Sequence, residues 1–178
     1  MDYFASDFHL GHNKPFIYEK RGFSSIEEHD TSILSEVSKL TAKDTLYYLG
    51  DFTFKSKVED ILKYYEFFKC KVVFITGNHD KYILQNKKYF DRFIFVDSLF
   101  NYKYNRNLIV LCHYPMRNWD RSHYNSWHLF GHIHDKTDFG GKTLNITIDN
   151  IGKFILSYND IEEYMKSRPN NYNFIEKE

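Results

Sequence analysis

The sequence predicts helix-flanked β-sheets within a single α/β domain. Three observations support this fold class. The first half of the chain alternates short apolar runs with helical stripes, the second half consists mostly of strand-like runs, and the length of 178 residues suits one domain. The domain is expected to span residues 1–168. A polar tail at 169–178 is expected to be loosely held, because Pro169 ends the last helical pattern.

In the first half, short apolar runs predict strands at residues 3–6, 45–49 and 71–76. Apolar positions at helical spacing predict helices between and after them, at about 25–40, 56–68 and 81–89. Ser25 with Glu28 has the spacing of a capping box, and Ser56 with Glu59 repeats it. These patterns give the chain a βαβα beginning.

The second half is richer in strands. Six runs are expected to be strands, at residues 93–96, 99–104, 107–112, 127–130, 142–148 and 153–156. A last helix is expected from Asn159, which with Glu162 forms another capping signature, to residue 167. The alternation followed by strands places all these elements in one α/β architecture.

Composition excludes several classes of protein. Lys plus Arg and Asp plus Glu each number 24, so the chain lacks the net charge that non-specific nucleic-acid or membrane binding uses. Apolar runs of five residues or so fall short of the about 20 that a membrane span needs, and no signal peptide is recognised at the start. Cys70 and Cys112 form no CxxC pair and are expected to be buried free thiols in the cytoplasm. With 17 Phe and 15 Tyr, the core is expected to be rich in rings.

Polar side chains that can bind metal ions follow several of the expected strands, at the point where each strand ends. Asp7 and His9 follow the first strand, and Asp51 follows the second. Asn78 and His79 follow the strand at 71–76. His113 follows the strand at 107–112, and His132 and His134 follow the strand at 127–130. Ligands in α/β sheets bind beyond the carboxyl ends of the strands, so these residues are expected to converge at one rim.

The donor types and spacings indicate metal binding. Asp7 and His9, like His132 and His134, are alternate residues, which share one side of an extended segment. Carboxylate, imidazole and amide donors without thiolate suit Mn²⁺, Fe²⁺ or Zn²⁺. Even seven of these side chains exceed one tetrahedral site and fit two ions that share a carboxylate. Glycines precede candidate ligands where the backbone must turn tightly or approach an ion, at Gly50, Gly77 and Gly131.

Each motif alone has an ordinary interpretation. Asp7-x-His9 could be a helix cap, His132-x-His134 a half-exposed pair in a strand, and the segment 77–80 a turn, since Gly, Asn and Asp favour turns. Their occurrence in this order, each at a strand end, favours a metal site instead.

Together these motifs resemble the signature blocks of calcineurin-like metallophosphoesterases. The blocks span residues 7–134, about three quarters of the chain. The opening segment 6–13, the segment 21–25 and His113-Tyr114-Pro115 with Trp119 look like a compact bacterial and phage subgroup of that superfamily. The resemblance implies an αββα sandwich of two packed mixed sheets flanked by helices, without a cap domain.

The resemblance also implies roles for particular residues. One metal ion would be held by Asp7, His9, Asp51 and His134, and a second by Asp51, Asn78, His113 and His132. His79 matches the catalytic histidine of the family, and Asp80 is a candidate for orienting or charge-stabilising it. His12 and Arg21 are candidates for substrate binding. His12 could equally be a surface histidine, and for Arg21 a solvated surface charge is the more common role.

The expected activity is hydrolysis of a phosphoester with two divalent ions, Mn²⁺ before Fe, Zn or Ni, where metal-activated hydroxide attacks phosphorus. A phosphodiester is favoured because the short chain leaves little room for a cap domain and the resembling small enzymes often prefer diesters. The alternatives are a phosphomonoesterase, a nuclease that meets nucleic acid only as substrate, and a non-catalytic scaffold of the same fold. Retention of His79 favours an enzyme over the scaffold. The oligomeric state is left open.

Overall fold

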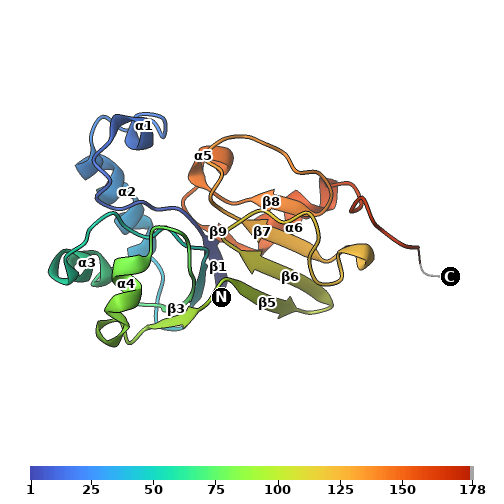
Figure 1. The fold of residues 1–178 in the computed structure, drawn as a ribbon, viewed down its shortest axis with the longest axis horizontal. Helices are drawn as coiled ribbons and strands as arrows, with labels where there is room; N and C mark the ends of the chain where they lie inside the picture. The colour runs from blue at the N-terminus through green and yellow to red at the C-terminus, as the bar shows by residue number, and fades with distance from the viewer. Residues whose placement is uncertain (177–178) are drawn as a thin grey trace.

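A computed structural model describes residues 1–176 and contains two β-sheets with helices around them (Figure 1). The first sheet has five strands in the order β4-β3-β2-β1-β9. Strands β1 to β4 are parallel, and β9 joins β1 antiparallel. The strands of this sheet are β1 Asp2–Ala5, β2 Thr45–Tyr48, β3 Lys71–Ile75, β4 Phe93–Val96 and β9 Leu156–Ser157.

The second sheet has four strands in the order β5-β6-β7-β8. Strand β5 is antiparallel to β6, whereas β6, β7 and β8 are parallel. Its strands are β5 Leu99–Tyr104, β6 Asn107–Cys112, β7 Trp127–Phe130 and β8 Thr143–Asn145. Two mixed sheets flanked by helices confirm the predicted fold class.

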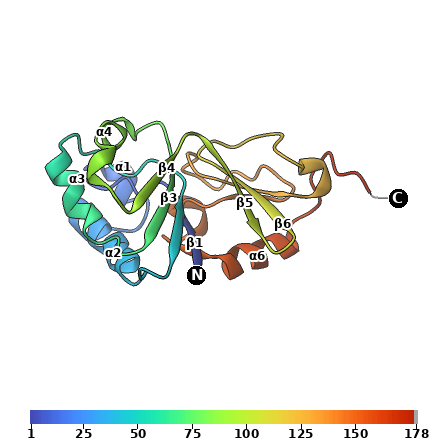
Figure 2. The ribbon, with the colours of Figure 1, turned by 90° about the horizontal axis from the view of Figure 1, so that it is seen from below.

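The helices cover the sheets. Helices α2, α3 and α4 gather beyond the first sheet at one end of the molecule, and α6 packs against β1 and β9 (Figure 2). The helices are α1 Pro15–Tyr18, α2 Ile26–Ser38, α3 Val58–Tyr65, α4 Lys81–Gln85, α5 Ile148–Ile151 and α6 Tyr158–Ser167, with 3₁₀ turns at Lys87–Tyr89 and Ser122–Tyr124. No helix within residues 1–176 is long and apolar enough to cross a membrane.

Buried side chains form two hydrophobic cores. One lies between the first sheet and helices α2, α3 and α4, and includes Phe52, Phe74 and Phe93, whose rings contact one another. The other lies between the two sheets and includes Phe4 and Leu111. The prediction of a ring-rich core is confirmed, and β3 is buried on both faces as parallel strands usually are.

The helix starts agree only in part with the capping signatures. Ser25 caps α2 by accepting the backbone N–H of Glu28, which is half of the predicted capping box; the Glu28 side chain accepts from Ser24 instead of from Ser25. The signature at Ser56 was wrong, because α3 starts after Lys57 with no side-chain cap. The signature at Asn159 was also wrong, because a capping box of Ser157 and Asp160 starts α6 two residues earlier.

The predicted strand at 142–148 is shorter than expected because Asn145 turns the chain. Its Oδ1 accepts the backbone N–H of Thr147, and its Nδ2 donates to the carbonyl of Ile133. This Asx-type turn ends β8 and leads into α5, which the sequence patterns missed.

The C-terminal tail is attached more firmly than predicted. Asn171 is 4% exposed, and its Nδ2 donates to the carbonyl oxygens of Ser122 and Ser126. Its Oδ1 accepts the backbone N–H of Lys142. A single amide side chain therefore fixes the tail to two loops of the second sheet; residues 177–178 lie outside the described chain.

Candidate metal centre

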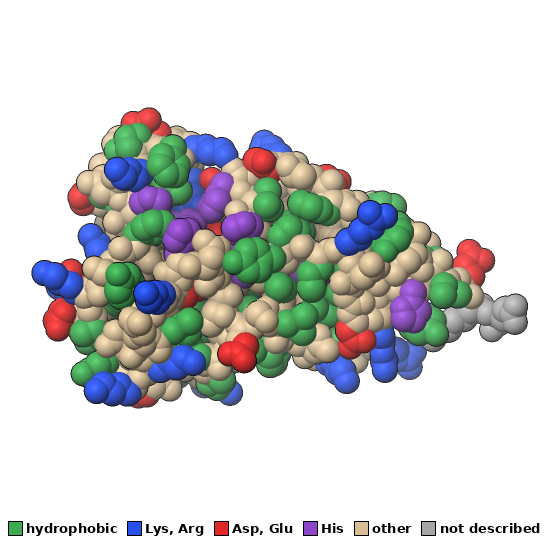
Figure 3. Space-filling model, viewed as in Figure 1, with side chains coloured by type: hydrophobic (Ala, Val, Ile, Leu, Met, Phe, Trp, Pro, Cys, Tyr) green, Lys and Arg blue, Asp and Glu red, His purple; other side chains and the backbone are tan. Residues whose placement is uncertain are grey.

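The strand ends bring the candidate ligands together. Six of them form two groups, and within each group the ligand atoms lie within 4.8 Å of one another. The first group is Asp7, His9 and His134, and the second is Asp51, His113 and His132. Figure 3 shows histidine side chains gathered on one face of the molecule. Residues from both sheets thus meet at one rim, as the strand-end pattern predicts.

In the first group, Asp7 Oδ1 lies 3.6 Å from His9 Nε2 and 3.5 Å from His134 Nε2. The two Nε2 atoms are 3.1 Å apart. Asp7 Oδ2 accepts bonds from the Ser6 hydroxyl and the His132 backbone N–H, whereas the buried Oδ1 has no hydrogen-bond partner. An unsatisfied buried carboxylate oxygen facing two imidazole nitrogens fits a cation.

In the second group, Asp51 Oδ2 lies 3.5 Å from His113 Nε2, and Asn78 Oδ1 lies 3.0 Å from the same nitrogen. Asp51 Oδ2 is also 3.8 Å from His9 Nε2 in the first group. Ligands about 2.1 Å from one ion lie about 3.0–3.5 Å apart, so these spacings suit metal coordination. One carboxylate oxygen stands between the two groups.

In two of the histidines, a hydrogen bond from Nδ1 fixes the orientation of the ring. His113 Nδ1 donates to the carbonyl oxygen of Leu49 at 2.7 Å, and His134 Nδ1 donates to Asp149 Oδ2 at 2.9 Å. A proton on Nδ1 leaves the lone pair of Nε2 free to bind a metal ion, which is the usual arrangement for ligating histidines.

Four candidate ligands have a left-handed backbone that non-glycine residues rarely adopt: Asp7, His9, Asp51 and His132, with φ between 49° and 66°. Such conformations cost on the order of 1–3 kcal/mol each and concentrate at functional sites. Local bonds hold them, since Asp7 N donates to Gly50 O at 3.0 Å and His9 N to Asp51 O at 3.1 Å. Strained backbone at four neighbouring candidate ligands is typical of a functional site.

Gly50 allows the loops to approach one another. Its φ is +87°, and a Cβ there would overlap the backbone of Gly77 and crowd the His113 ring. Only glycine adopts a positive φ readily and has no Cβ atom, which explains its position directly before Asp51.

Charges and burial shift several pKa values at the centre. Burial alone would raise the pKa of Asp7, but the nearby imidazoles of His9, His113 and His134 lower it overall. Burial lowers the pKa of His9 and of His132. These shifts favour the ionised carboxylate and neutral imidazoles, the protonation states that bind metal.

His79 lies at the mouth of the site. Its side chain is 44% exposed, and Nε2 is 3.9 Å from Asp51 Oδ2. Its backbone N–H donates to Asp51 Oδ1 at 2.8 Å. The imidazole is therefore held beside the second group of ligands while it remains open to a substrate.

Asp80 has a different contact set from the one predicted. Within residues 1–176 it forms no ion pair or hydrogen bond with His79. Its carboxylate accepts the backbone N–H groups of Asp51, Phe52 and Gly77 at 2.7–2.9 Å. Burial raises the pKa of Asp80 to about 6 despite these donors. Asp80 thus ties together two ligand loops, in place of the expected direct action on His79.

Arg21 also lies elsewhere than predicted. Its side chain is fully buried, and Nη2 forms an ion pair with Asp149 Oδ2 at 2.8 Å. The guanidinium also donates to the carbonyl oxygens of Asp7 and Phe8. This placement gives Arg21 a positioning role instead of the predicted contact with substrate.

Asp149 was missed by the sequence analysis. Its carboxylate bonds both Arg21 and His134, which lower its pKa well below the usual value although burial opposes this. The available signal was its position directly after the run 142–148 predicted as a strand, the same signal that identified the ligands.

His12 lies at the edge of the centre. Its ring stacks on Phe54 with centroids 3.5 Å apart, and the Phe54 ring contacts that of His79 at 4.5 Å. Burial, together with the charges of His9 and His79, lowers the pKa of His12 to about 4. Phe54 is 39% exposed, so a neutral imidazole and a phenyl ring form an open shelf beside His79.

Comparisons with known proteins agree with this geometry. A family model of calcineurin-like phosphoesterases matches residues 3–175, so the chain belongs to that family of metal-dependent phosphoester hydrolases. An uncharacterized protein of Methanocaldococcus jannaschii, MJ1445, is 28% identical over 134 residues, which cover 74% of this chain and 68% of the relative. The crystal structure of AQ665 from Aquifex aeolicus, a protein of unknown function, matches with a TM-score of 0.68 and 25% identity, covering 92% of this chain and 98% of that one.

Proposed function

We propose that the protein is a phosphodiesterase that works with two divalent metal ions. The observation that carries the proposal is the position of Asp51 Oδ2, 3.8 Å from His9 Nε2 and 3.5 Å from His113 Nε2. The proposed ligands of the first ion are Asp7, His9, Asp51 and His134, and those of the second are Asp51, Asn78, His113 and His132. When bound, two such ions would supply positive charge to phosphate oxygens and would lower the pKa of a bound water molecule.

The chain's own side chains have separate tasks in this mechanism. Asp149 and the carbonyl of Leu49 hold His134 and His113 with Nε2 unprotonated. Asp80 holds the loops that carry Asp51 and Asn78. His79 donates a proton to the leaving oxygen or stabilises the negative charge on the equatorial phosphoryl oxygens, a contribution typically worth about 10²–10⁴-fold in rate.

The preference for a diester is supported by the open mouth of the site. The described chain consists of the two sheets and their flanking helices, and His79 is 44% exposed. An open mouth leaves room for the second ester group that a diester carries on phosphorus. The oxygen and nitrogen donors suit Mn²⁺. A reducing cytoplasm is proposed because both cysteines are buried and free.

Hydrolysis of two chromogenic substrates tests the proposal. Chelator-stripped protein is supplied with Mn²⁺ and offered bis(p-nitrophenyl) phosphate or p-nitrophenyl phosphate. The expected result is metal-dependent turnover that is faster with the diester. His79→Ala should lower kcat by about 10²–10⁴-fold with its metal content retained, whereas the control His123→Ala, outside the centre, should match wild type. Faster cleavage of the monoester would contradict the diester preference, and no turnover of either substrate would contradict the enzymatic role.

A further inference from the structure

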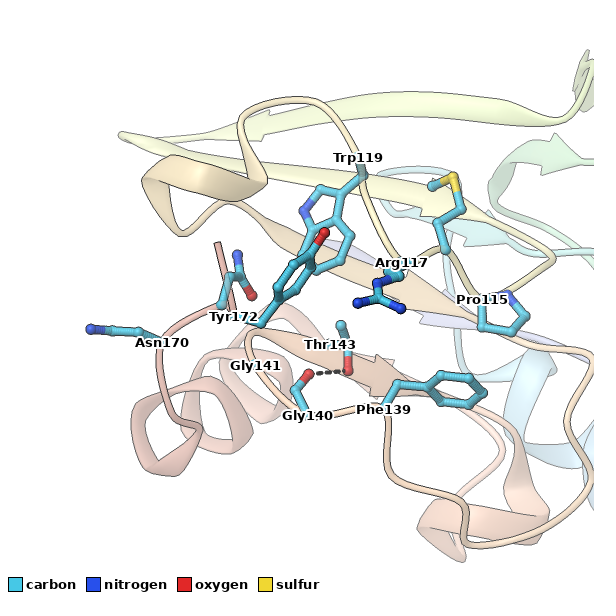
Figure 4. Close-up of a pocket in the computed structure, with 11 residues that line it drawn as sticks. Pro115, Arg117, Trp119, Phe139, Gly140, Gly141, Thr143, Asn170 and Tyr172 are labelled. Atoms are coloured by element: carbon cyan, nitrogen blue, oxygen red, sulfur yellow. Dashed lines mark hydrogen bonds between the residues drawn. The ribbon is translucent and has the colours of Figure 1, made fainter. Parts of the chain in front are cut away.

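A cavity opens at the second sheet, on the loops that follow two of the metal ligands. It has a volume of about 640 Å³ and lies between the loop 115–119, the turn 139–141 and the tail segment 170–172 (Figure 4). Small-molecule sites usually measure about 300–1,000 Å³. The cavity therefore has the size of a ligand pocket, and the tail supplies one of its walls.

Two of its walls are continuations of the loops that carry metal ligands. Pro115 is two residues after His113, so their Cα atoms are at most about 7.6 Å apart. Tyr114 lies between them, and its ring contacts those of His113 and His132 at 5.0 and 4.7 Å. Phe139 follows His134 by five residues. Figure 3 shows hydrophobic side chains on the same face beside the histidines. One edge of the cavity is therefore formed by the segments that follow the ligands His113 and His134.

Aromatic side chains line the cavity. Trp119 is fixed by its Nε1, which donates to the carbonyl of Ser126 at 3.1 Å. Phe139 and Tyr172 are 47% and 63% exposed, so each offers a ring to a ligand. Planar groups such as nucleobases stack on rings of this kind.

Arg117 supplies the charge. It is the single charged side chain among the eleven lining residues, and no carboxylate within residues 1–176 forms an ion pair with it. Its guanidinium lies 5.2 Å from the centre of the Tyr172 ring and is directed between the aromatic walls (Figure 4). An exposed guanidinium with no acidic partner is suited to bind an anion, preferably a phosphate group.

We infer that this cavity binds the part of the substrate that lies away from the reacting phosphorus, and that this part carries a planar ring and a second anionic group, as in a nucleoside monophosphate unit. The inference deepens the proposed function and rests on it, because the bound unit is part of a substrate only if the protein hydrolyses diesters. Binding to the cavity itself can be measured without metal ions.

The first test titrates adenosine 5′-monophosphate into protein kept in chelator and follows tryptophan fluorescence, to which Trp119 and Trp127 contribute. The expected result is saturable quenching, with adenosine binding at least tenfold more weakly because it lacks the anion. Arg117→Gln should weaken binding of the monophosphate at least tenfold, whereas Arg106→Gln, an equal charge change in the turn between β5 and β6, should not. Equal binding by wild type and Arg117→Gln, or absence of binding, would overturn the inference.

The second test asks whether the bound unit belongs to a substrate. With Mn²⁺ present, wild type should have a lower KM for a diadenosine phosphodiester with a terminal 5′-phosphate than for the same compound without it. Arg117→Gln should raise KM for the phosphorylated compound and so remove that difference. No difference in the wild-type protein would overturn the substrate role. Arg117-dependent binding without hydrolysis of any diester would instead refute the proposed function.

Discussion

Replacing Asp149 with asparagine is expected to weaken both the fold and the metal centre. The substitution keeps the size of the side chain and an oxygen that can accept the His134 Nδ1 proton. It removes the negative charge that lies 2.8 Å from Arg21 Nη2. Because the Arg21 side chain is 0% exposed and that of Asp149 is 2% exposed, water cannot replace the lost partner.

The size of the effect follows from this burial. Removing one partner of a buried ion pair costs about 3–5 kcal/mol, because it leaves an uncompensated charge. The loss of the negative charge behind His134 should weaken Mn²⁺ binding by about 10–100-fold. The double variant Asp149→Asn with Arg21→Met leaves no unpaired charge, so it should be destabilised by less than the sum of the single variants.

Urea unfolding in chelator measures the first effect, and Mn²⁺ titration by calorimetry measures the second. Asp138→Asn is the matched control, because Asp138 pairs with Arg168 but is 62% exposed. It should cost less than about 1 kcal/mol. A loss of unfolding free energy in Asp149→Asn no larger than in this control would refute the prediction. So would a loss in the double variant equal to the sum of the losses in the two single variants.

Three further outcomes follow from single residues. Burial lowers the pKa of His128 to about 4 from its ordinary 6.5. The stability that depends on its neutral form is therefore complete above pH 6.5 and is lost as the pH falls towards 4. Over that range, urea unfolding should show wild type losing about 3 kcal/mol more than His128→Asn. Gly131→Ala places a Cβ against the side chains of Ser6 and Asp7, and should cost about 1–3 kcal/mol and reduce Mn²⁺ binding, seen by calorimetry. Asp80→Asn should lower unfolding free energy by about 1–3 kcal/mol, whereas a fall in kcat with full stability would show that Asp80 acts on His79.

The candidate ligands could be predicted because their signal is local. A short apolar run that ends in Asp, Asn or His identifies a strand and the residue at its carboxyl end at the same time. Parallel pairing of β1 with β2 and β2 with β3 then places Asp7, Asp51 and Asn78 side by side. The strands 93–96, 99–104, 107–112 and 127–130 have the predicted bounds, because turns separate them sharply in the sequence.

The positioning residues could not be predicted in the same way, because their partners are distant in the chain. Arg21 and Asp149 are separated by 128 residues. A lone arginine in a polar segment gives no indication that a carboxylate will bury it. The roles of Asp80 and Asn171 likewise depend on backbone N–H and C=O groups, whose direction is set only after the loops have folded.

The number of metal ions bound per chain tests the central claim most directly. Equilibrium dialysis against Mn²⁺ followed by metal analysis should find two ions in the wild-type protein and in the control His123→Ala. Asp51→Ala should bind at most one, because Asp51 Oδ2 stands between the two groups of ligands. A single ion in the wild-type protein, or two ions retained by Asp51→Ala, would contradict the account.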